Sequence, residues 1–474
     1  MKKTKIIATH GPAIKWEEWI LSLYDAWVNV IRFNFSHAQY DSVSETLAYI
    51  RKNNRSGRTA MSMLLDTKWP EIRTWDLTVK QKYTQWDIFK FYISQDAFIE
   101  DGSSLFCDYI YLGEDAYIGQ IIDVDSGLFQ VKVIELYDNY LEVEALNDAV
   151  IWSRRHVNLP WVRLKMPGIT EKDKDDIRFA VKESMDFIAQ SFVRSADNIQ
   201  ELREFLKELW AEHIRIIAKI ENAEGIDNLT EIIRESDGIM VARGDLGIEV
   251  PIEKLPTYQA NIIKETLKAW KFTIIATHLL ESMIENPFPT RAEVSDIYNS
   301  VMQRSDAVML SGETAAGKYP YKSVNVMSAT IIEAEKNIFL EHREYSQDGL
   351  TARDIEKKSL IKSAIYAWEE LWVQALFIFT KSWKLANLSS SFRPNLPIYA
   401  FTPYLSSVAY MNILYGVKPY LVENWDSDFL WNVTEAIGIC KADGVLKVGD
   451  RVMLVNDMRK KGKEMPLVEL LEIV

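Results

Sequence analysis

Cysteine, glycine and long apolar runs are all scarce in this chain of 474 residues. The only two cysteines, Cys107 and Cys440, lie far apart and lack metal-ligand spacing, which excludes a disulfide framework and is typical of a reducing cytoplasm. No uninterrupted apolar stretch is long enough to span a membrane, and the one after the basic start is too short for a signal peptide. We therefore expect a cytoplasmic protein without a membrane partner.

An excess of positive charge is also missing. The formal net charge is -13, and no basic stripe is present to neutralise phosphates, which argues against nucleic acid as the main partner. Hydrophobic residues make up 48% of the chain and charged residues 26%, as in ordinary globular proteins. The length allows two or three domains with a large core.

What the chain does contain is a regular alternation of short apolar runs and amphipathic helical stretches. The apolar runs predict β-strands at residues 5–9, 28–33, 61–65, 186–190, 214–218, 238–242, 272–276 and 307–310. Helices are predicted between them, for example at 173–182, 198–209 and 257–269, and Thr170 with Asp173 has the spacing of a capping box. Eight such strands predict an α/β fold with a parallel (β/α)8 TIM barrel. A doubly wound open sheet is the alternative, but no G-x-G-x-x-G motif follows the first strand.

Two regions depart from this alternation. Residues 76–160 carry strand patterns, such as those at 120–124, 129–134 and 140–145, and predict a small β-barrel-like domain inserted after the third strand as a lid. From residue 338 onward, helices at 354–370 and 427–439 and strands at 375–379, 397–401 and 451–455 predict a separate α/β domain. We therefore expect a barrel in two parts (1–75 and 161–337), an inserted lid (76–160) and a C-terminal domain (338–474).

Polar side chains follow the C-terminal ends of most of the predicted strands. They are Arg32 and Asn34, Asp66 and Lys68, Ser191 and Arg194, Lys219 and Glu221, Arg243 and Asp245, Thr277, and Ser311 and Glu313. The active sites of barrel enzymes lie at this end of the barrel. The pattern therefore predicts an active site there rather than a set of unrelated solvated loops.

Two of these strand ends supply carboxylates. Lys219 and Glu221 are two residues apart at one strand end, so their side chains point to the same side. This pair suits a divalent metal beside an anionic substrate, and from this segment alone a structural ion pair fits equally well. Asp245 adds a carboxylate from the next strand end, and Gly244 lets the backbone approach a ligand. Two carboxylates with oxygen ligands only favour Mg²⁺ over zinc.

The second and third strand ends offer an arginine and several oxygen atoms. Arg32 suits a phosphate because its guanidinium presents a fixed fork of donors. Asn34 and Ser36, with Asp66 and Thr67 after the next strand, form an oxygen cluster suited to a monovalent cation. Taken alone, this cluster fits capping and turn chemistry better than a cation site.

Seven segments together resemble the pyruvate kinase family. They are NFSH at 34–37, DTK at 66–68 with PEIR at 70–73, KIEN at 219–222, RGDLG at 243–247, ESM at 281–283, PTRAE at 289–293 and MLSGETA at 309–315. The similarity extends almost from end to end. It implies a barrel, a lid and a C-terminal regulatory domain, and the glycolytic transfer of a phosphoryl group from phosphoenolpyruvate to ADP, which gives pyruvate and ATP.

The resemblance also implies roles for individual residues. It assigns catalysis to Lys219, Thr277 and Arg32, substrate binding to the same three with Gly244 and Asp245, and nucleotide binding to Asn34, His37, Arg73 and Arg155. It implies Mg²⁺ (or Mn²⁺) at Glu221 and Asp245, and K⁺ at Asn34, Ser36, Asp66 and Thr67, with Glu71 also indicating K⁺ dependence. The family further implies a homotetramer, and residues 380–384 resemble its loop for a phosphorylated effector.

Tryptophan stands at several positions where the family pattern has glycine. The chain has 19 glycines, about 4% against a usual share of roughly 7%, but 15 tryptophans. The positions are Trp27, Trp69, Trp75, Trp152, Trp161, Trp270 and Trp383, and Trp86 and Trp210 fit the same pattern. Because drift would replace glycine by many residue types, we hypothesise that UGA codons encoding glycine have been read as tryptophan. A tryptophan-rich natural variant is the alternative.

Two other functions are compatible with these residues. A Mg²⁺-dependent barrel lyase or aldolase acting on phosphoenolpyruvate or pyruvate could use Lys219, Glu221 and Asp245, but it would leave the lid and the K⁺ cluster without a purpose. A catalytically impaired, metabolite-sensing pseudoenzyme is expected only if the tryptophans are genuine.

Overall fold

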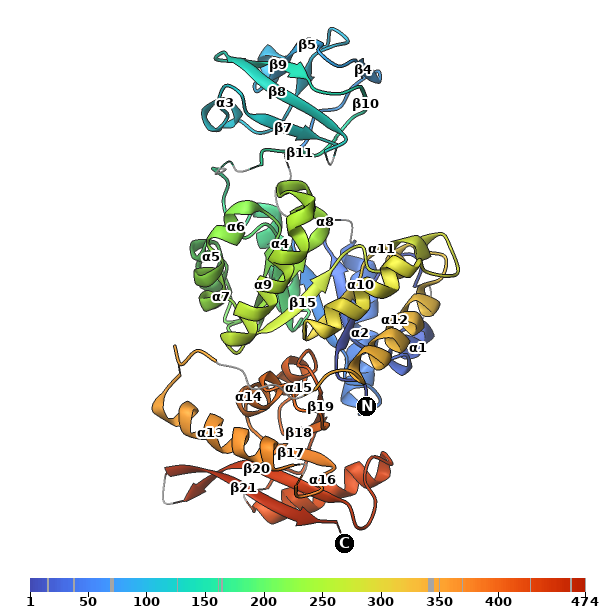
Figure 1. Cartoon of the computed structure of the whole chain (residues 1–474), viewed down its shortest axis with the longest axis vertical. Coiled ribbons are helices and arrows are strands. Elements are labelled where there is room, and N and C mark those ends of the chain that lie inside the picture. The colour runs from blue at the N-terminus through green and yellow to red at the C-terminus, as the bar shows by residue number, and fades with distance from the viewer. Residues whose placement is uncertain are drawn as a thin grey trace.

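The computed structural model describes the chain except for residues 15–16, 37–38, 69–71, 126, 161, 163–164, 340–344, 349, 369, 427, 461–462 and 474. Three bodies are stacked along its long axis (Figure 1). A β-rich body lies at one end, a barrel in the middle, and an α/β body at the other end.

Eight parallel strands close into the central barrel. In hydrogen-bonded order they are β1 (Lys5–Thr9), β16 (Ala307–Leu310), β15 (Phe272–Ala276), β14 (Gly238–Ala242), β13 (Arg215–Ile220), β12 (Phe187–Gln190), β3 (Ser62–Asp66) and β2 (Val28–Asn34). Pairing of β2 with β1 completes the ring. The predicted TIM barrel is confirmed, and this closure excludes the open doubly wound sheet.

Helices surround the barrel and also follow several strands directly. The outer helices are α1 (Glu17–Asp25), α2 (Tyr40–Arg55), α4 (Glu171–Lys182), α5 (Ala196–Glu208), α7 (Leu229–Glu235), α9 (Leu255–Lys268), α10 (Arg291–Met302) and α12 (Pro320–Glu335). Short helical turns α6 (Ala223–Asp227), α8 (Arg243–Glu249), η2 (Ile252–Lys254), η3 (Glu281–Ile284) and α11 (Gly312–Ala315) follow the strand ends. The predicted capping box starts α4, since Thr170 Oγ1 accepts from the Asp173 amide at 3.1 Å and Asp173 Oδ2 accepts from the Thr170 amide at 2.9 Å.

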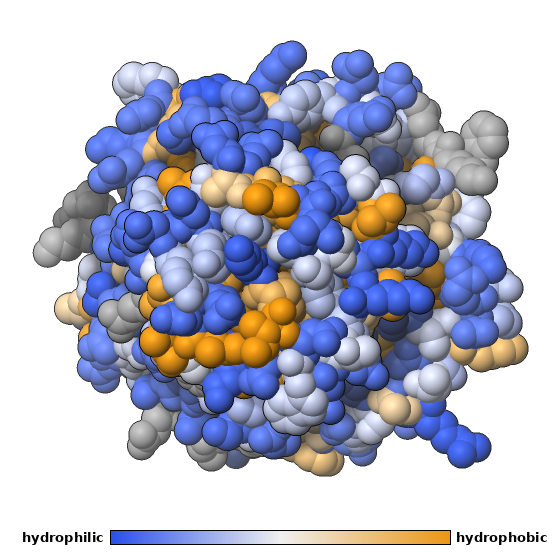
Figure 2. Space-filling view, turned by 90° about the horizontal axis from the view of Figure 1, so that it is seen from above, coloured by the Kyte–Doolittle hydropathy of each residue, from blue (hydrophilic) through white to orange (hydrophobic). Residues whose placement is uncertain are grey.

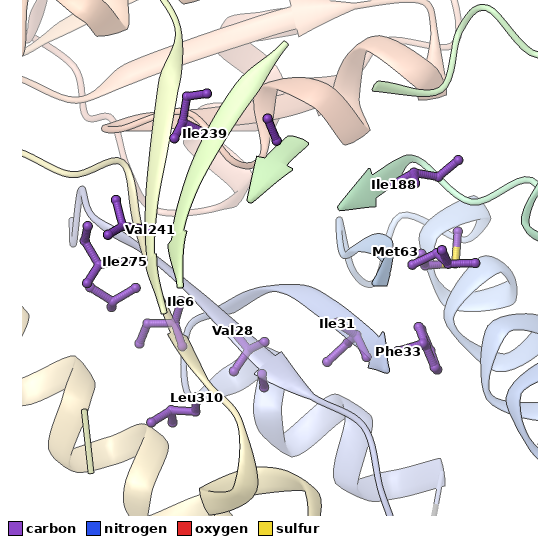
Figure 3. Packing of buried hydrophobic residues seen from close by; sticks show 14 of the residues in the cluster. Ile6, Val28, Ile31, Phe33, Met63, Ile188, Ile239, Val241, Ile275 and Leu310 are labelled. Atoms are coloured by element: carbon purple, nitrogen blue, oxygen red, sulfur yellow. The ribbon is translucent and has the colours of Figure 1, made fainter. Parts of the chain in front are cut away.

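The barrel strands are buried on both faces. Side chains such as Ile6, Ile31 and Phe33 belong to the core between strands and helices (Figure 3). The alternate residues, such as Ile7 and Val30, belong to a second core that continues into the C-terminal body. Burial on both faces explains why these strands are near-continuous apolar runs in the sequence.

The β-rich body is inserted between β3 and α4. Its six-stranded sheet has the order β11 (Val157–Asn158), β7 (Ile121–Val124), β8 (Phe129–Leu136), β9 (Tyr140–Ala145), β5 (Ile88–Tyr92) and β6 (Leu105–Phe106). A second sheet pairs β10 (Ala149–Ile151) with β4 (Gln81–Tyr83), and η1 (Gln95–Ala97) and α3 (Leu112–Asp115) complete the insertion. Figure 2 looks down on this end of the molecule, which is largely hydrophilic with small separate apolar patches.

The C-terminal body is a five-stranded sheet with helices. Its elements are α13 (Ala352–Ala367), β17 (Ala375–Phe379), α14 (Lys384–Ser391), β18 (Ile398–Thr402), α15 (Leu405–Met411), β19 (Val417–Leu421), α16 (Phe429–Ala442), β20 (Arg451–Lys460) and β21 (Lys463–Glu472). A buried ion pair between Arg393 Nη2 and Asp306 Oδ2, 2.5 Å apart, attaches it to the barrel. Within the described ranges, no helix combines the length and apolarity needed to cross a membrane.

Candidate active site

The polar strand ends lie at the end of the barrel that faces the inserted body. The insertion leaves the barrel after β3 and returns before α4, so it stands next to the C-terminal ends of the strands (Figure 1). Strand ends from β2, β3, β12 and β13 bring together a buried group of side chains, the central cluster, which consists of Arg32, Asp66, Ser191, Lys219 and Glu221.

Lys219 is the centre of this cluster. Its Nζ lies 3.0 Å from Asp66 Oδ1 and 2.9 Å from Glu221 Oε1, and it donates a hydrogen bond of 2.7 Å to Ser191 Oγ. Burial disfavours the charged form of Lys219, but the Asp66 and Glu221 carboxylates outweigh burial and raise its pKa. Lys219 is therefore a fixed, permanently charged ammonium at the mouth of the barrel.

Asp66 joins Lys219 to Arg32. Its Oδ2 atom lies 2.6 Å from Arg32 Nε, while Arg32 Nη1 donates to Thr9 Oγ1 at 3.0 Å. Burial would raise the pKa of Asp66, but the charges of Lys219 and Arg32 outweigh it and lower that pKa. Asp66 is thus an anion that holds two cations in place.

Glu221 is the least satisfied member of the cluster. Its Oε2 atom accepts a hydrogen bond of 2.6 Å from the Phe192 amide. Its Oε1 atom is buried 2.9 Å from Lys219 Nζ, but among the described residues no donor forms a hydrogen bond of good geometry to it. Burial raises the pKa of Glu221 to about 7 despite the Lys219 ammonium, and the nearby Asp245 carboxylate adds to the rise. A buried carboxylate oxygen of this kind, close to a second carboxylate, suits a hard divalent cation.

The donor set fits Mg²⁺ better than a metal whose ligands are all protein side chains. Among the residues that the structure describes, no group of three or more His, Cys, Asp or Glu side chains gathers to hold a metal. Glu221 and Asp245 offer two carboxylates, and Mg²⁺ is commonly held by one or two carboxylates with water and substrate oxygens as its other ligands.

The predicted K⁺ ligands lie at the adjoining ends of β2 and β3. Asn34 pairs with Asp66 in the register of the two strands, and Asn34 Oδ1 accepts a hydrogen bond from the Ser36 amide at 3.2 Å. Thr67 Oγ1 accepts from the Ser191 amide at 3.1 Å. The structure therefore brings these oxygen-bearing residues to the edge of the central cluster.

Thr277 follows β15 in a strained conformation. Its φ of 68° is left-handed, which is a clear outlier for a β-branched residue. Its Oγ1 accepts from the Gly244 amide at 2.7 Å, and its carbonyl accepts from Arg243 Nη2 at 2.6 Å, while Arg243 Nη1 lies 2.7 Å from Asp296 Oδ2. Strain that the surroundings hold in place is typical of functional sites. These bonds also fix Thr277 beside the Gly244–Asp245 segment.

Arg73 and Arg155 lie at the base of the inserted body rather than in the central cluster. Arg73 Nη1 donates to the Arg154 carbonyl at 2.8 Å, and Arg73 Nη2 lies 2.8 Å from His156 Nε2. Arg155 Nη1 lies 3.3 Å from Asp125 Oδ1. Both arginines therefore belong to the body that faces the barrel. Two further predicted residues, His37 and Glu71, lie outside the described residues.

A cavity opens beside the central cluster. Its volume is about 940 Å³, and its lining includes His10, Arg32, Asn34, Thr277 and Ser311. It therefore joins the Arg32 and Thr277 sides of the barrel mouth and offers space for a substrate next to the fixed charges.

Sequence reasoning gave no role to three residues that organise the site. Ser191 receives the Lys219 hydrogen bond, Thr9 holds Arg32, and Arg243 holds Thr277. Ser191 and Arg243 were recognisable as polar residues at strand ends, and Thr9 ends β1. Only the closed barrel shows which neighbour each of them supports.

Comparison with known proteins agrees with this geometry. The family model described as "Pyruvate kinase, barrel domain" matches residues 1–324, and "Pyruvate kinase, alpha/beta domain" matches residues 358–466. Pyruvate kinases of Staphylococcus aureus strains USA300 and bovine RF122 / ET3-1 are each 38% identical over 462 residues, which is 96% of this chain and 77% of theirs.

A solved structure shows the same likeness in three dimensions. The crystal structure of a pyruvate kinase from Cryptosporidium parvum superposes with a TM-score of 0.93 at 32% identity, covering 100% of this chain and 96% of the other. Family models, relatives and structure cover both ends of the chain and the site between them. The chain belongs to the pyruvate kinase family of phosphotransferases.

Proposed function

We propose that this chain transfers the phosphoryl group of phosphoenolpyruvate to ADP, with Mg²⁺ (or Mn²⁺) and K⁺ as cofactors. The bond between phosphorus and the enol oxygen breaks, its electron pair stays on that oxygen, and phosphorus forms a bond to a terminal phosphate oxygen of ADP. The enolate carbon then takes a proton to give pyruvate. The observation that carries this proposal is a single buried ammonium, Lys219, fixed between two carboxylates at the mouth of a barrel.

Lys219 and Arg32 supply the positive charge that this reaction needs. Phosphoryl transfer depends on positioning and on neutralising the negative charge that spreads over the transferred group. Lys219 Nζ is held by Asp66 and Ser191, so its charge is oriented before substrate arrives. Asp66 and Thr9 hold Nε and Nη1 of Arg32, which leaves the Nη2 group to bind the substrate phosphate.

Glu221 and Asp245 would hold the divalent cation. When bound, the cation supplies charge neutralisation to the substrate oxygens and the transferred group. The Oε1 atom of Glu221, which is buried beside Lys219 Nζ without a well-formed hydrogen bond, and the raised pKa of this carboxyl support the assignment, because a cation would bind this atom and favour the ionised form of the carboxyl.

Asn34, Ser36, Asp66 and Thr67 would hold K⁺ through oxygen atoms. Their place at the edge of the central cluster supports this role, since a monovalent cation there adds charge close to Arg32. K⁺ would therefore contribute to anchoring the substrate phosphate.

Thr277 would deliver the proton through water, and Gly244 beside it would contact the substrate. The left-handed φ of Thr277, the Gly244 amide bound to its hydroxyl and the Arg243 guanidinium bound to its carbonyl hold the residue in place. We assign the space beside Arg32 and Asn34 to ADP, with Arg73 and Arg155 approaching from the inserted body, residues 76–160, as a lid. We further propose a cytoplasmic homotetramer.

The test is pyruvate formation that depends on phosphoenolpyruvate, ADP, Mg²⁺ and K⁺. It is measured for the chain with tryptophan and for a variant with glycine at seven positions. These positions are Trp27, Trp69, Trp75, Trp152, Trp161, Trp270 and Trp383. Activity that disappears when ADP or Mg²⁺ is left out supports the proposal. Inactivity of both proteins under complete conditions overturns it.

A further inference from the structure

Residues with a left-handed backbone conformation are tryptophan more often than the number of tryptophans in this chain explains. Thirteen non-glycine residues among those described have a positive φ, and five of them are tryptophan, which has only 15 representatives in 474 residues. The five are Trp27 (74°), Trp86 (77°), Trp210 (56°), Trp270 (63°) and Trp372 (54°). In this region the β-carbon crowds the backbone, so glycine is the usual occupant.

Two of the five end long helices in a motif that favours glycine. After α5, the Trp210 amide donates to the Lys207 carbonyl at 3.0 Å, and the next amide, that of Ala211, donates to the Leu206 carbonyl at 2.8 Å. After α9, Trp270 and the residue following it form the same pair of bonds, at 3.0 and 3.1 Å. These bonds define the Schellman motif, in which the left-handed residue is most often glycine.

Glycine does occupy this place at other helix ends of the same chain. Gly57 after α2 and Gly444 after α16 have φ values of 72° and 67°, and their amides donate to the third residue back at 3.2 and 3.0 Å. Ser184 and Arg304 occupy it after α4 and α10, so a side chain can be accommodated. The unusual feature is therefore the residue type, not the motif.

Trp86 sits in a turn that also requires glycine. The Asp87 amide donates to the Thr84 carbonyl at 3.1 Å, which closes a four-residue turn between β4 and β5. Trp86 is the third residue of this turn, with a positive φ, and Gln85 before it has none. That pattern is a type II turn, whose third position favours glycine.

Packing does not explain four of the five indoles. The exposed fraction is 91% for Trp210, 77% for Trp372, 63% for Trp86 and 47% for Trp27. Burial of these rings therefore gives little compensation for the strained backbone. Only Trp270 is buried, where it stacks on Tyr345 with ring centroids 4.3 Å apart.

We propose that the cells that make this protein insert glycine at positions 27, 86, 210, 270 and 372, because they read the codon UGA as glycine. The backbone identifies these positions without reference to any relative, and it adds Trp372 to those that the family pattern singled out. One reassigned codon explains all five, whereas independent substitution requires five separate strained changes to the same residue.

Glycine in place of tryptophan would also change one cation–π site and one cavity. The centre of the Trp152 ring lies 3.4 Å from Lys80 Nζ and 5.7 Å from the Arg155 guanidinium, so glycine there removes both cation–π contacts in the inserted body. Trp270 and Trp383 both line a cavity of about 670 Å³ between the barrel and the C-terminal body. Glycine at both positions enlarges that cavity by two indole rings.

The gene and the native protein test the proposal directly. We expect UGA at the five positions and UGG at Trp368 and Trp431, which lie in helical backbone. Peptides of the protein purified from its own cells should carry glycine where Trp210 and Trp372 are written. UGG codons at the five positions, or tryptophan in those peptides, would overturn the proposal.

Thermal unfolding of variants made in a standard bacterial host separately tests the argument that tryptophan strains the backbone at these positions. We expect Trp210→Gly and Trp372→Gly each to raise Tm by about 1–2 °C, because glycine relieves the left-handed strain. The matched control is Trp431→Gly, an exposed position in the first turn of α16, which should lower Tm because glycine has a lower helix propensity than tryptophan. A fall or no change in Tm for both test variants would refute the argument from strain.

Discussion

Replacement of Lys219 by methionine tests the centre of the site. The methionine side chain has a similar length but no charge, so the change removes the ammonium that lies 3.0 Å from Asp66 and 2.9 Å from Glu221. Both carboxylate side chains are only 1% exposed. The variant therefore leaves two buried acids with one cation, Arg32, instead of two.

The expected loss of stability follows from the burial of this pair. Removing one partner of a buried ion pair costs about 3–5 kcal/mol. Because burial already raises the pKa of Glu221 to about 7, protonation of this carboxyl relieves part of the cost at neutral pH. Each pH unit above that pKa adds about 1.4 kcal/mol to the cost. The Tm difference between variant and parent should therefore be larger at pH 8.5 than at pH 6.5.

The expected loss of activity is separate from the loss of stability. A group that stabilises transition-state charge contributes roughly 10²–10³ in rate. We expect Lys219→Met to lower kcat/KM for phosphoenolpyruvate by about this factor, measured as ADP-dependent pyruvate formation below the Tm of the variant. The parent for this comparison is whichever form, with tryptophan or with glycine, proves active.

Lys271→Met provides the matched control. Lys271 is also largely buried, with a pKa that burial lowers to about 8, but it precedes β15 at the opposite end of the barrel. It should change stability and leave kcat/KM within about twofold of the parent. If Lys219→Met keeps more than about a tenth of the parent kcat/KM, the role assigned to the ammonium is wrong.

Three further predictions concern other parts of the site. Thr277→Val, which removes the hydroxyl at constant shape, should lower the rate of enolate protonation more than the rate of phosphoryl transfer. The first rate is measured as proton exchange at pyruvate and the second as ATP formation, and equal slowing of both would argue against proton delivery by Thr277. Asn34→Ala should raise the K⁺ concentration needed for half-maximal activity, and an unchanged K⁺ titration would contradict its role as a ligand. Glu249 Oε1 accepts from Asn158 Nδ2 of the inserted body at 2.8 Å, and burial raises the pKa of Glu249 to about 7. The contribution of Glu249 to stability is therefore complete below its ordinary pKa of 4.5 and is lost as pH rises through 7. Glu249→Gln should therefore flatten the decline of Tm between pH 5 and 8, and an equally steep decline in the variant would refute the assignment.

Much of the fold was predictable because strand burial leaves a local signal. The strands at 238–242, 272–276 and 307–310 agree with the structure residue for residue, since both faces are covered and every position except Thr273 is apolar. The C-terminal body was predicted less completely. Helices α14 and α15 and strands β19 and β21 were not identified, because β21 is partly charged and α14 is rich in serine.

The sequence also predicted that polar residues at different strand ends lie close together, because barrel topology brings strand ends together. Lys219, Glu221 and Asp66 are such strand-end residues, and the structure places them in one cluster. Arg73 and Arg155 differ, since both contact residues of the inserted body. Their distance from the barrel therefore depends on how that body is placed.

The sequence by itself determined the eight-strand alternation, the polar strand ends and the family, because each is written in residue type and spacing over short distances. Only the tertiary structure decided that Lys219 Nζ lies between Asp66 and Glu221, that Thr277 is strained, and that Asp66 also holds Arg32. These properties depend on neighbours from different strands, which meet only when the barrel closes. The same distinction applies to tryptophan, since composition raised the question of glycine, and the φ angles of the helix ends and turns identify the positions that favour glycine.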